Sequence, residues 1–325
     1  MQNEPIPTLS IIVTVVAGKQ CLRNHLEVLC PQARSNHCEI LVPFDCWSEE
    51  IGGLASEFPE VTFSFCGDLG LKGSATISKS NHCLYDRRRA VGLRLCRGNI
   101  VALTEDHAIP ADDWLNRLLQ AHQQPYDVIG GAVENGVDRP MNRAWYFCDF
   151  GRYGRPFESR EVQYVSDVNI SYKRQALMKT QSLWWDSYHE TTVNWALQAL
   201  GTKLFLDAEP VVYQCRPTLS FWRALGERAA WGKVFATTRA ATLPLFRRLL
   251  FAVGTLGLPV ILFCRALRHM NRQRQGTLRI LSTFPIIACF VVCWAGGEMA
   301  GYLLGERNMD ADASPERKAA MSVFR

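Results

Sequence analysis

The chain has 325 residues, of which 48% are hydrophobic and 21% charged, and its formal net charge is +5. This length fits one large α/β domain with an appendage or two modest domains, and the composition supplies enough apolar residues for a buried core. Arginine and lysine concentrate between residues 216 and 279, beside the most apolar stretches, which favours a membrane surface over nucleic acid as partner. The twelve cysteines include no CxxC pair, which argues against a structural zinc site.

The first half of the chain alternates between strand and helix patterns. Residues 9–16 are apolar and β-branched, which predicts a strand buried on both faces, and no basic residue precedes them as in a signal peptide. The alternation that follows indicates βαβ units and a parallel sheet. In chain order, the predicted elements are a helix over 20–30, strands over 39–45 and 61–65, a loop over 66–82, a helix over 86–96 and a strand over 99–104.

Acidic side chains stand where two of these strands end. Asp45 ends the strand over 39–45, and Glu105, Asp106 and His107 follow the strand over 99–104. In parallel sheets the ligand binds at the carboxyl ends of the strands. These four residues are therefore predicted to share one crevice.

The second half of this domain is less regular. A helix over 190–200 ends at Gly201, a typical C-terminal cap. The other predicted elements are strands over 127–133 and 165–172, an aromatic-rich loop over 134–164, and edge strands over 203–206 and 211–213.

The chain changes character after Pro217. Aromatic and basic residues mix over 218–242, which predicts an amphipathic helix in a membrane interface. Two apolar stretches follow, over 249–264 and over 280–304, the second interrupted at Gly296, Gly297 and Glu298.

The topology of these stretches stays open. A span needs about 20 apolar residues, and the first stretch is short. A two-span hairpin, a re-entrant first segment and two buried helices of a soluble protein all fit, while the arginines between the stretches favour a cytoplasmic turn. The expected domains are a catalytic domain over 1–217, the interfacial helix over 218–242, two membrane segments over 243–305 and a polar tail over 306–325.

Several segments together resemble glycosyltransferase family 2, over roughly residues 8–240. The segments that carry the resemblance are 7–14, Arg89–Gly92, Cys96–Pro110, Asp113–Leu115, 168–174 and His189–Glu190, and residues 297–302 resemble the tail of membrane-attached members that build polysaccharides. The resemblance implies an α/β GT-A fold, in which a mostly parallel, mixed Rossmann-like sheet carries helices on both faces. Membrane-associated helices would follow it at the C-terminus.

The resemblance also implies a donor site for a nucleotide-diphosphate sugar. Asp45, Arg89, Glu105 and Asp106 would contact the donor. The DxD signature of the family reads Glu105-Asp106-His107 here, so His107 and Asp106 would hold a divalent cation, Mn²⁺ or Mg²⁺. A solvated acidic turn is the plainer interpretation of the same run.

Glu190 is the candidate catalytic base, at the position where the family has the Asp of its Glu-Asp pair. A glutamate in a first helical turn also complements the helix dipole and needs no catalytic role. The acceptor-side candidates are Asp167, Asn169, Trp185 and His189.

The predicted function is an inverting glycosyltransferase at the cytoplasmic face of the inner membrane, with a lipid-linked or saccharide acceptor. The Gln-x-x-Arg-Trp run of processive members is replaced by Glu227–Trp231, which predicts one sugar per acceptor. The alternative is an inactive nucleotide-sugar-binding or scaffolding protein. A nucleotidyltransferase is disfavoured, because the Gly-rich loop after its first strand is missing.

Overall fold

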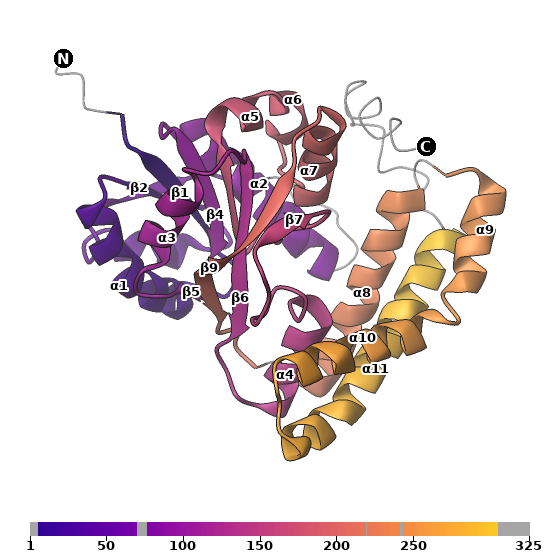
Figure 1. Cartoon of the computed structure of the whole chain (residues 1–325). Helices are drawn as coiled ribbons and strands as arrows, with labels where there is room; N and C mark the ends of the chain where they lie inside the picture. Colours follow the sequence, from indigo (N-terminus) through magenta and orange to yellow (C-terminus); the bar gives the residue numbers. More distant parts are fainter. Residues whose placement is uncertain (1–5, 70–76, 219, 241–242, 305–325) are drawn as a thin grey trace. The chain divides into compact units, whose positions relative to one another are not determined.

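The computed structural model describes residues 6–69, 77–218, 220–240 and 243–304 (Figure 1). The predicted tail over 306–325, and residues 70–76 of the predicted loop, lie outside these ranges. The chain divides into two compact units. Unit 1 holds residues 1–73, 82–136 and 155–217, and unit 2 holds 74–81, 137–154 and 218–325.

Unit 1 is built on one mixed sheet. Its strands are β1 Leu9–Thr14, β2 Glu39–Phe44, β3 Val61–Phe65, β4 Ile100–Glu105, β5 Ala108–Pro110, β6 Val128–Asn135, β7 Arg160–Val162, β8 Asn169–Lys173 and β9 Leu204–Gln214. The order is β3-β2-β1-β4-β8-β6-β9-β5, with β7 paired to β9. Strands β1, β2, β3 and β4 run parallel to one another, whereas β8 is antiparallel to both β4 and β6. The predicted α/β fold with a mostly parallel, mixed sheet is confirmed.

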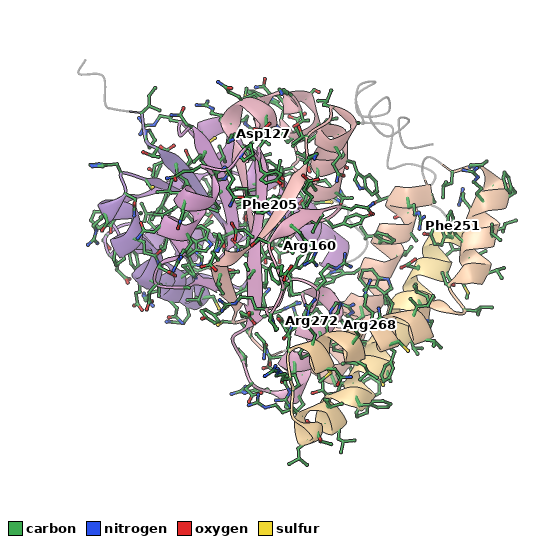
Figure 2. All side chains as sticks on the ribbon, viewed as in Figure 1. Asp127, Arg160, Phe205, Phe251, Arg268 and Arg272 are labelled. Carbon is green, nitrogen blue, oxygen red and sulfur yellow. The ribbon has the colours of Figure 1, made fainter. Side chains whose placement is uncertain are left out.

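Helices flank this sheet (Figure 1). They are α1 Lys19–Ser35, the 3-10 helix η1 Glu49–Leu54, α2 Ile77–Leu95, α3 Trp114–Ala121, α5 Arg174–Met178, α6 Gln181–Trp184 and α7 Glu190–Ala199. Helix α1 buries Leu22, Leu26, Leu29 and Ala33, a helical spacing that puts one face on the core. Figure 2 marks Phe205 of β9, which stacks on Tyr126 with 4.2 Å between ring centroids.

Three predicted segments differ from the structure. Residues 77–82 of the predicted loop over 66–82 belong to helix α2. The predicted loop over 134–164 contains a helix, α4 Pro140–Asp149, as well as β7. The two predicted edge strands over 203–206 and 211–213 form the single strand β9, whose pairing with β6 shifts register between Gly130 and Ala132. The shift lies opposite residues 207–210, the polar stretch of sequence that separated the two predicted strands.

Unit 2 is helical. Besides α4, it comprises α8 Phe221–Ala240, α9 Leu245–Gly254, α10 Leu258–Arg272 and α11 Thr277–Leu304. Its core joins Ala144–Phe147 of α4 to Ala224, Met270 and Phe290 of the other helices. Figure 2 marks Arg272, whose Nη2 donates to the carbonyl oxygens of Gly151 and Gly154, both at 2.8 Å.

Helix α11 continues through residues 296–298, the point where the apolar sequence is interrupted. Glycine is needed at this point because another helix lies very close: a Cβ added at Gly297 would lie 2.0 Å from the carbonyl oxygen of Ala229 in α8. The backbones of α8 and α11 therefore approach closely at this point, and the packing outweighs the low helix propensity of glycine.

Replacing Gly297 with alanine is expected to destabilise unit 2 by about 1–3 kcal/mol, because the new methyl group must displace the α8 backbone. The neighbouring Gly296 is a matched control: its added Cβ would meet no atom within 4 Å. Gly296→Ala should be neutral or stabilising by about 0.5–1 kcal/mol. Thermal unfolding in detergent measures both, and equal Tm values for the two variants would contradict the close packing.

Helix α11 meets the length and composition of a membrane span. Its apolar window has a mean hydropathy of 2.0 and is 28% buried. Helices α9 and α10 meet the same test only as a pair, and they are bent by 57° at the break between them. These criteria are length and composition alone, and a core helix of a soluble protein can also meet them.

Candidate active site

Arg89 of α2 binds three carboxylates from different parts of unit 1. Its Nη2 lies 2.7 Å from Glu105 at the end of β4 and 2.9 Å from Asp167 before β8, and its Nη1 lies 3.2 Å from Asp86. The Arg89 side chain is only 4% exposed. Burial disfavours its charge, but the charges of Asp167, Glu105 and Asp86 outweigh burial and raise the pKa of Arg89. The structure thus brings together three residues from the predicted site.

Glu190 stands beside this cluster, as the first residue of α7. Its Oε2 accepts the backbone N–H of Asp167 at 3.4 Å, and its Oε1 accepts from Nδ2 of Asn194 at 3.4 Å. Burial, and secondly the charge of Asp167, raise the pKa of Glu190 well above its ordinary value. A raised carboxyl pKa suits a group that must take up a proton near neutral pH.

Two tyrosines and an asparagine support Glu190, and sequence reasoning missed them. The Tyr172 hydroxyl donates to Oδ1 of Asn194 at 2.8 Å and lies 2.7 Å from the Tyr188 hydroxyl. Burial raises the pKa of both tyrosines well above the ordinary value, so both are neutral hydrogen-bonding groups. Asn194 follows Glu190 by four residues, a helical neighbour spacing, and this was the available signal.

The Glu105-Asp106-His107 run lies at the end of β4, and its three side chains have different partners. Asp106 is fully buried, and its carboxylate accepts the backbone N–H groups of Val16, Ala17 and Gly18 at 2.8–3.0 Å. It therefore anchors the turn between β1 and α1. The hypotheses that Asp106 contacts the donor or a metal stay predictions, and either role would require some of these bonds to be exchanged.

His107 and Glu105 are the pair that would suit a cation. Nε2 of His107 lies 3.4 Å from Oε2 of Glu105, and Nδ1 lies 3.1 Å from Asp106. Burial raises the pKa of Glu105, while His107 and Arg89 oppose this rise. Among the described residues, no group of three or more His, Cys, Asp or Glu side chains is arranged to hold a metal ion. Mg²⁺ is often bound through only one or two protein carboxylates together with substrate phosphates, so the Glu105–His107 pair fits this type of site.

Asp45 is paired with Arg88, the neighbour of Arg89 on α2. Its two carboxylate oxygens accept from Nε and Nη2 of Arg88, both at 2.9 Å, and Oδ1 also accepts the Trp47 N–H at 2.9 Å. Asp45 is fully buried and Arg88 nearly so. The predicted nucleobase contact of Asp45 stays a prediction, and the exposed Trp47 lies two residues away.

The remaining acceptor-side candidates lie in different surroundings. Asn169 is buried: it accepts from Nε1 of Trp114 and donates to the carbonyl oxygens of Ala132 and Pro210, all at 2.9 Å. This set of bonds ties β8 to β6, β9 and α3. Trp185 is 46% exposed, with the Arg94 guanidinium 5.6 Å from its ring centroid.

His189 precedes α7 as its N-cap residue. Its Nδ1 lies 3.1 Å from the Thr192 hydroxyl, one turn into the helix. This contact fixes the ring next to Glu190. The acceptor role of His189, like those of Trp185 and Asn169, stays a prediction.

Comparison with known proteins identifies the family. The sequence profile of Glycosyl transferase family 2 matches residues 10–180, more than half of the chain. The chain belongs to glycosyltransferase family 2. It is a glycosyltransferase (EC 2.4) that transfers a sugar from a nucleotide-sugar donor. No curated protein sequence matches the chain.

Several solved structures align with this family 2 transferase. A mannosyltransferase, PcManGT from Pyrobaculum calidifontis in complex with GDP-Man and Mn²⁺, aligns with TM-score 0.53 and 15% identity over 91% of this chain and 88% of that one. Residues 1–349 of S. aureus TarS align with TM-score 0.46 and 12% identity over 90% of each chain. Glucosyl-3-phosphoglycerate synthase from Mycobacterium tuberculosis, in complex with UDP, gives 0.42 and 12% over 70% of this chain and 78% of that one. At identities of 12–15%, these alignments concern the fold alone, and only the alignment with PcManGT is used as evidence for it.

Proposed function

We propose that this family 2 enzyme is an inverting transferase in which Glu190 is the general base. The observation that carries the proposal is the continuous set of contacts from Glu190 through Asp167 and Arg89 to Glu105. These contacts join the candidate base to the turn that corresponds to the DxD signature. One site could therefore hold a donor and deprotonate an acceptor.

The proposed reaction is a single displacement. An acceptor hydroxyl oxygen forms a bond to the anomeric carbon while the bond from that carbon to the diphosphate oxygen breaks, and the hydroxyl proton passes to Glu190. The nucleoside diphosphate leaves with the bonding electrons. Attack opposite the leaving group inverts the anomeric configuration. The raised pKa of Glu190 supports its role as proton acceptor.

A divalent cation, Mn²⁺ or Mg²⁺, would be held by Glu105 and His107 together with the donor diphosphate. When bound, it neutralises charge on the departing diphosphate. Imidazole and carboxylate ligands together are compatible with Mn²⁺. Nε2 of His107 and Oε2 of Glu105 lie 3.4 Å apart.

Transfer of one sugar per acceptor is also part of the proposal. The Arg228 side chain, in the region that carries the processive motif in other members, is buried within unit 2. It binds Asp149 at 2.5 Å and lies 4.8 Å from the Trp294 ring centroid. These contacts give Arg228 a packing role within unit 2, and the proposal of one sugar per acceptor rests on the missing Gln-x-x-Arg-Trp run.

Unit 2 would attach the enzyme to the cytoplasmic face of the inner membrane. Large apolar side chains are exposed on α9, α10 and α11, among them Leu245, Phe246, Leu250, Val253, Val260, Ile261, Leu278 and Leu281. The partner of α11 is α8, which carries charged residues such as Lys233 beside Gly301. Because a charged helix is costly inside hydrocarbon, we propose that the apolar face enters one leaflet while α8 stays outside it. Co-sedimentation with anionic vesicles tests this, and failure to bind them would contradict it.

The proposed acceptor is a lipid-linked saccharide or a saccharide at that surface. An enzyme held on a membrane meets lipid-linked substrates at a raised effective concentration. Basic residues of unit 2, including Arg268 of α10 (Figure 2), would favour binding to anionic lipids.

The decisive experiment measures donor binding and turnover by the full-length protein in detergent. UDP- and GDP-sugars, GDP-mannose among them because PcManGT holds it, are compared with and without Mn²⁺. We expect metal-dependent release of nucleoside diphosphate that His107→Ala weakens. Failure to bind any nucleotide sugar under any metal condition would overturn the proposal.

A further inference from the structure

An open pocket of about 700 Å³ lies where β6 and β9 end, in unit 1. Small-molecule sites typically measure about 300–1,000 Å³, so this volume admits one or two sugar rings. The residues that line the pocket are Glu134, Asn135, Arg155, Pro156, Phe157 and Tyr213. None of them belongs to the cluster around Arg89 and Glu190.

The lining combines aromatic rings with an ion pair. Tyr213 is 39% exposed, and the ring of Phe157 lies 5.8 Å from the guanidinium of Arg160. Oε1 of Glu134 accepts both the backbone N–H of Arg155, at 3.1 Å, and its Nε, at 3.0 Å. Oε2 of Glu134 and the two terminal amino groups of Arg155 take no part in these bonds. They present acceptor and donor groups side by side.

This set of groups matches the chemistry of a pyranose. A sugar ring has apolar C–H faces, which pack on aromatic rings, and neighbouring hydroxyls, which both donate and accept hydrogen bonds. A carboxylate beside a guanidinium satisfies a pair of such hydroxyls. An apolar ligand would cover the carboxylate and the guanidinium without offering them hydrogen bonds, so an apolar ligand fits this pocket poorly.

The pocket is fixed to the turn of the candidate active site by backbone hydrogen bonds. The Cys215 N–H donates to the His107 carbonyl oxygen at 2.7 Å, and the Gly136 N–H donates to that of Gln214 at 3.0 Å. A Cβ added at Gly136 would lie 2.3 Å from Sγ of Cys215 and 3.3 Å from Cβ of Tyr213. Only glycine therefore allows the chain leaving β6 to approach Tyr213 so closely.

We propose that this pocket binds a pyranose unit of the acceptor. The proposal rests on the transferase function proposed above and specifies where that enzyme recognises its acceptor. Tyr213 provides the packing surface, and Glu134 with Arg155 selects for paired hydroxyls.

The position in the sheet favours the acceptor over the donor. At the candidate donor site, Asp45 comes directly after β2 and Glu105 is the last residue of β4. The pocket lies at the ends of two other strands, β6 and β9. Strand β8 separates β4 from β6, so β6 lies two strand spacings away, about 9–10 Å. The pocket and the candidate donor site therefore lie at the ends of different strands of one sheet.

Saturation-transfer NMR on the full-length protein in detergent tests the proposal. The probes are methyl glycosides of glucose, mannose, galactose and N-acetylglucosamine, each with excess UDP, GDP and Mn²⁺ to occupy the donor site. We expect saturation transfer to the ring protons of at least one glycoside. Tyr213→Ala should weaken its binding about fivefold, the value of one lost aromatic contact.

A matched control and a second variant keep the test decisive. Tyr164 is 46% exposed and does not line the pocket, so Tyr164→Ala should leave glycoside binding unchanged. Glu134→Gln preserves the size of the side chain and should also weaken binding, even if Tyr213→Ala fails to fold. Equal binding by wild type and both pocket variants, or no transfer to any glycoside, would overturn the proposal.

Donor hydrolysis separates this proposal from the proposed function. If wild type hydrolyses a nucleotide sugar but binds no glycoside, the pocket proposal alone fails. If it binds no nucleotide sugar, the proposed function fails whatever the glycoside result. Retained donor hydrolysis in Tyr213→Ala together with weakened glycoside binding would support both.

Discussion

Arg89→Met is expected to destabilise unit 1 by about 3–5 kcal/mol and to abolish sugar transfer. The guanidinium is the common partner of Asp86, Glu105 and Asp167, and its side chain is 4% exposed. Removing it leaves three carboxylates with their charges uncompensated in a site that water reaches poorly. Urea unfolding followed by tryptophan fluorescence measures the loss, and donor turnover measures the activity.

The control for this variant is a surface pair with similar geometry. Arg23 binds both oxygens of Glu57 at 2.8 Å, but on the exposed face of α1. Arg23→Met should change the unfolding free energy far less, because solvent screens exposed pairs. The double variant Arg89→Met, Asp167→Asn should recover part of the lost stability. Equal, small losses for Arg23→Met and Arg89→Met would contradict the central role of Arg89.

The sheet could be predicted because its strands are specified locally. The residues of β1 and β4 are nearly all buried and mostly apolar, so their pattern alone indicates strands covered on both faces. Helix α4 could not be predicted in the same way. Its aromatic residues, Trp145 to Phe147, are buried against helices that begin at Phe221 or later in the chain. A loop rich in aromatic residues and a helix packed on a distant partner look alike in a single sequence.

The sequence names several residues of the candidate site but does not show how they pair. Arg88 and Arg89 are neighbours on α2, and neighbours in a helix point about 100° apart. This rotation sends Arg88 to Asp45 and Arg89 to Glu105. The sequence shows a basic run without revealing which arginine meets which acid, because that depends on how α2 is rotated against the sheet. The hydrogen bonds of Asp106 to the β1–α1 turn depend equally on tertiary contacts.

The raised pKa of Glu190 predicts opposite effects of pH on stability and activity. Because the folded-state pKa lies above the unfolded value, the unfolded chain releases this proton first as pH rises. The contribution of Glu190 to stability therefore falls from the ordinary glutamate pKa up through the raised one. A general base acts when deprotonated, so activity should rise over the same window. Glu190 therefore contributes least to the stability of the fold in the pH range in which it can act as a base.

Glu190→Gln is expected to lower sugar transfer by about 10²–10⁴-fold while donor binding is kept, because the amide cannot take the acceptor proton. The same variant should unfold at a higher Tm than wild type at alkaline pH and at a similar Tm at acidic pH, since it removes the ionised form. Asp167→Asn should shift the acid limb of the pH–rate profile of the wild type to lower pH, because the charge of Asp167 raises the pKa of Glu190. Glu161→Gln, on an exposed strand, serves as the control and should change neither property. Full transfer activity in Glu190→Gln would leave Glu190 as a residue that only complements the α7 dipole.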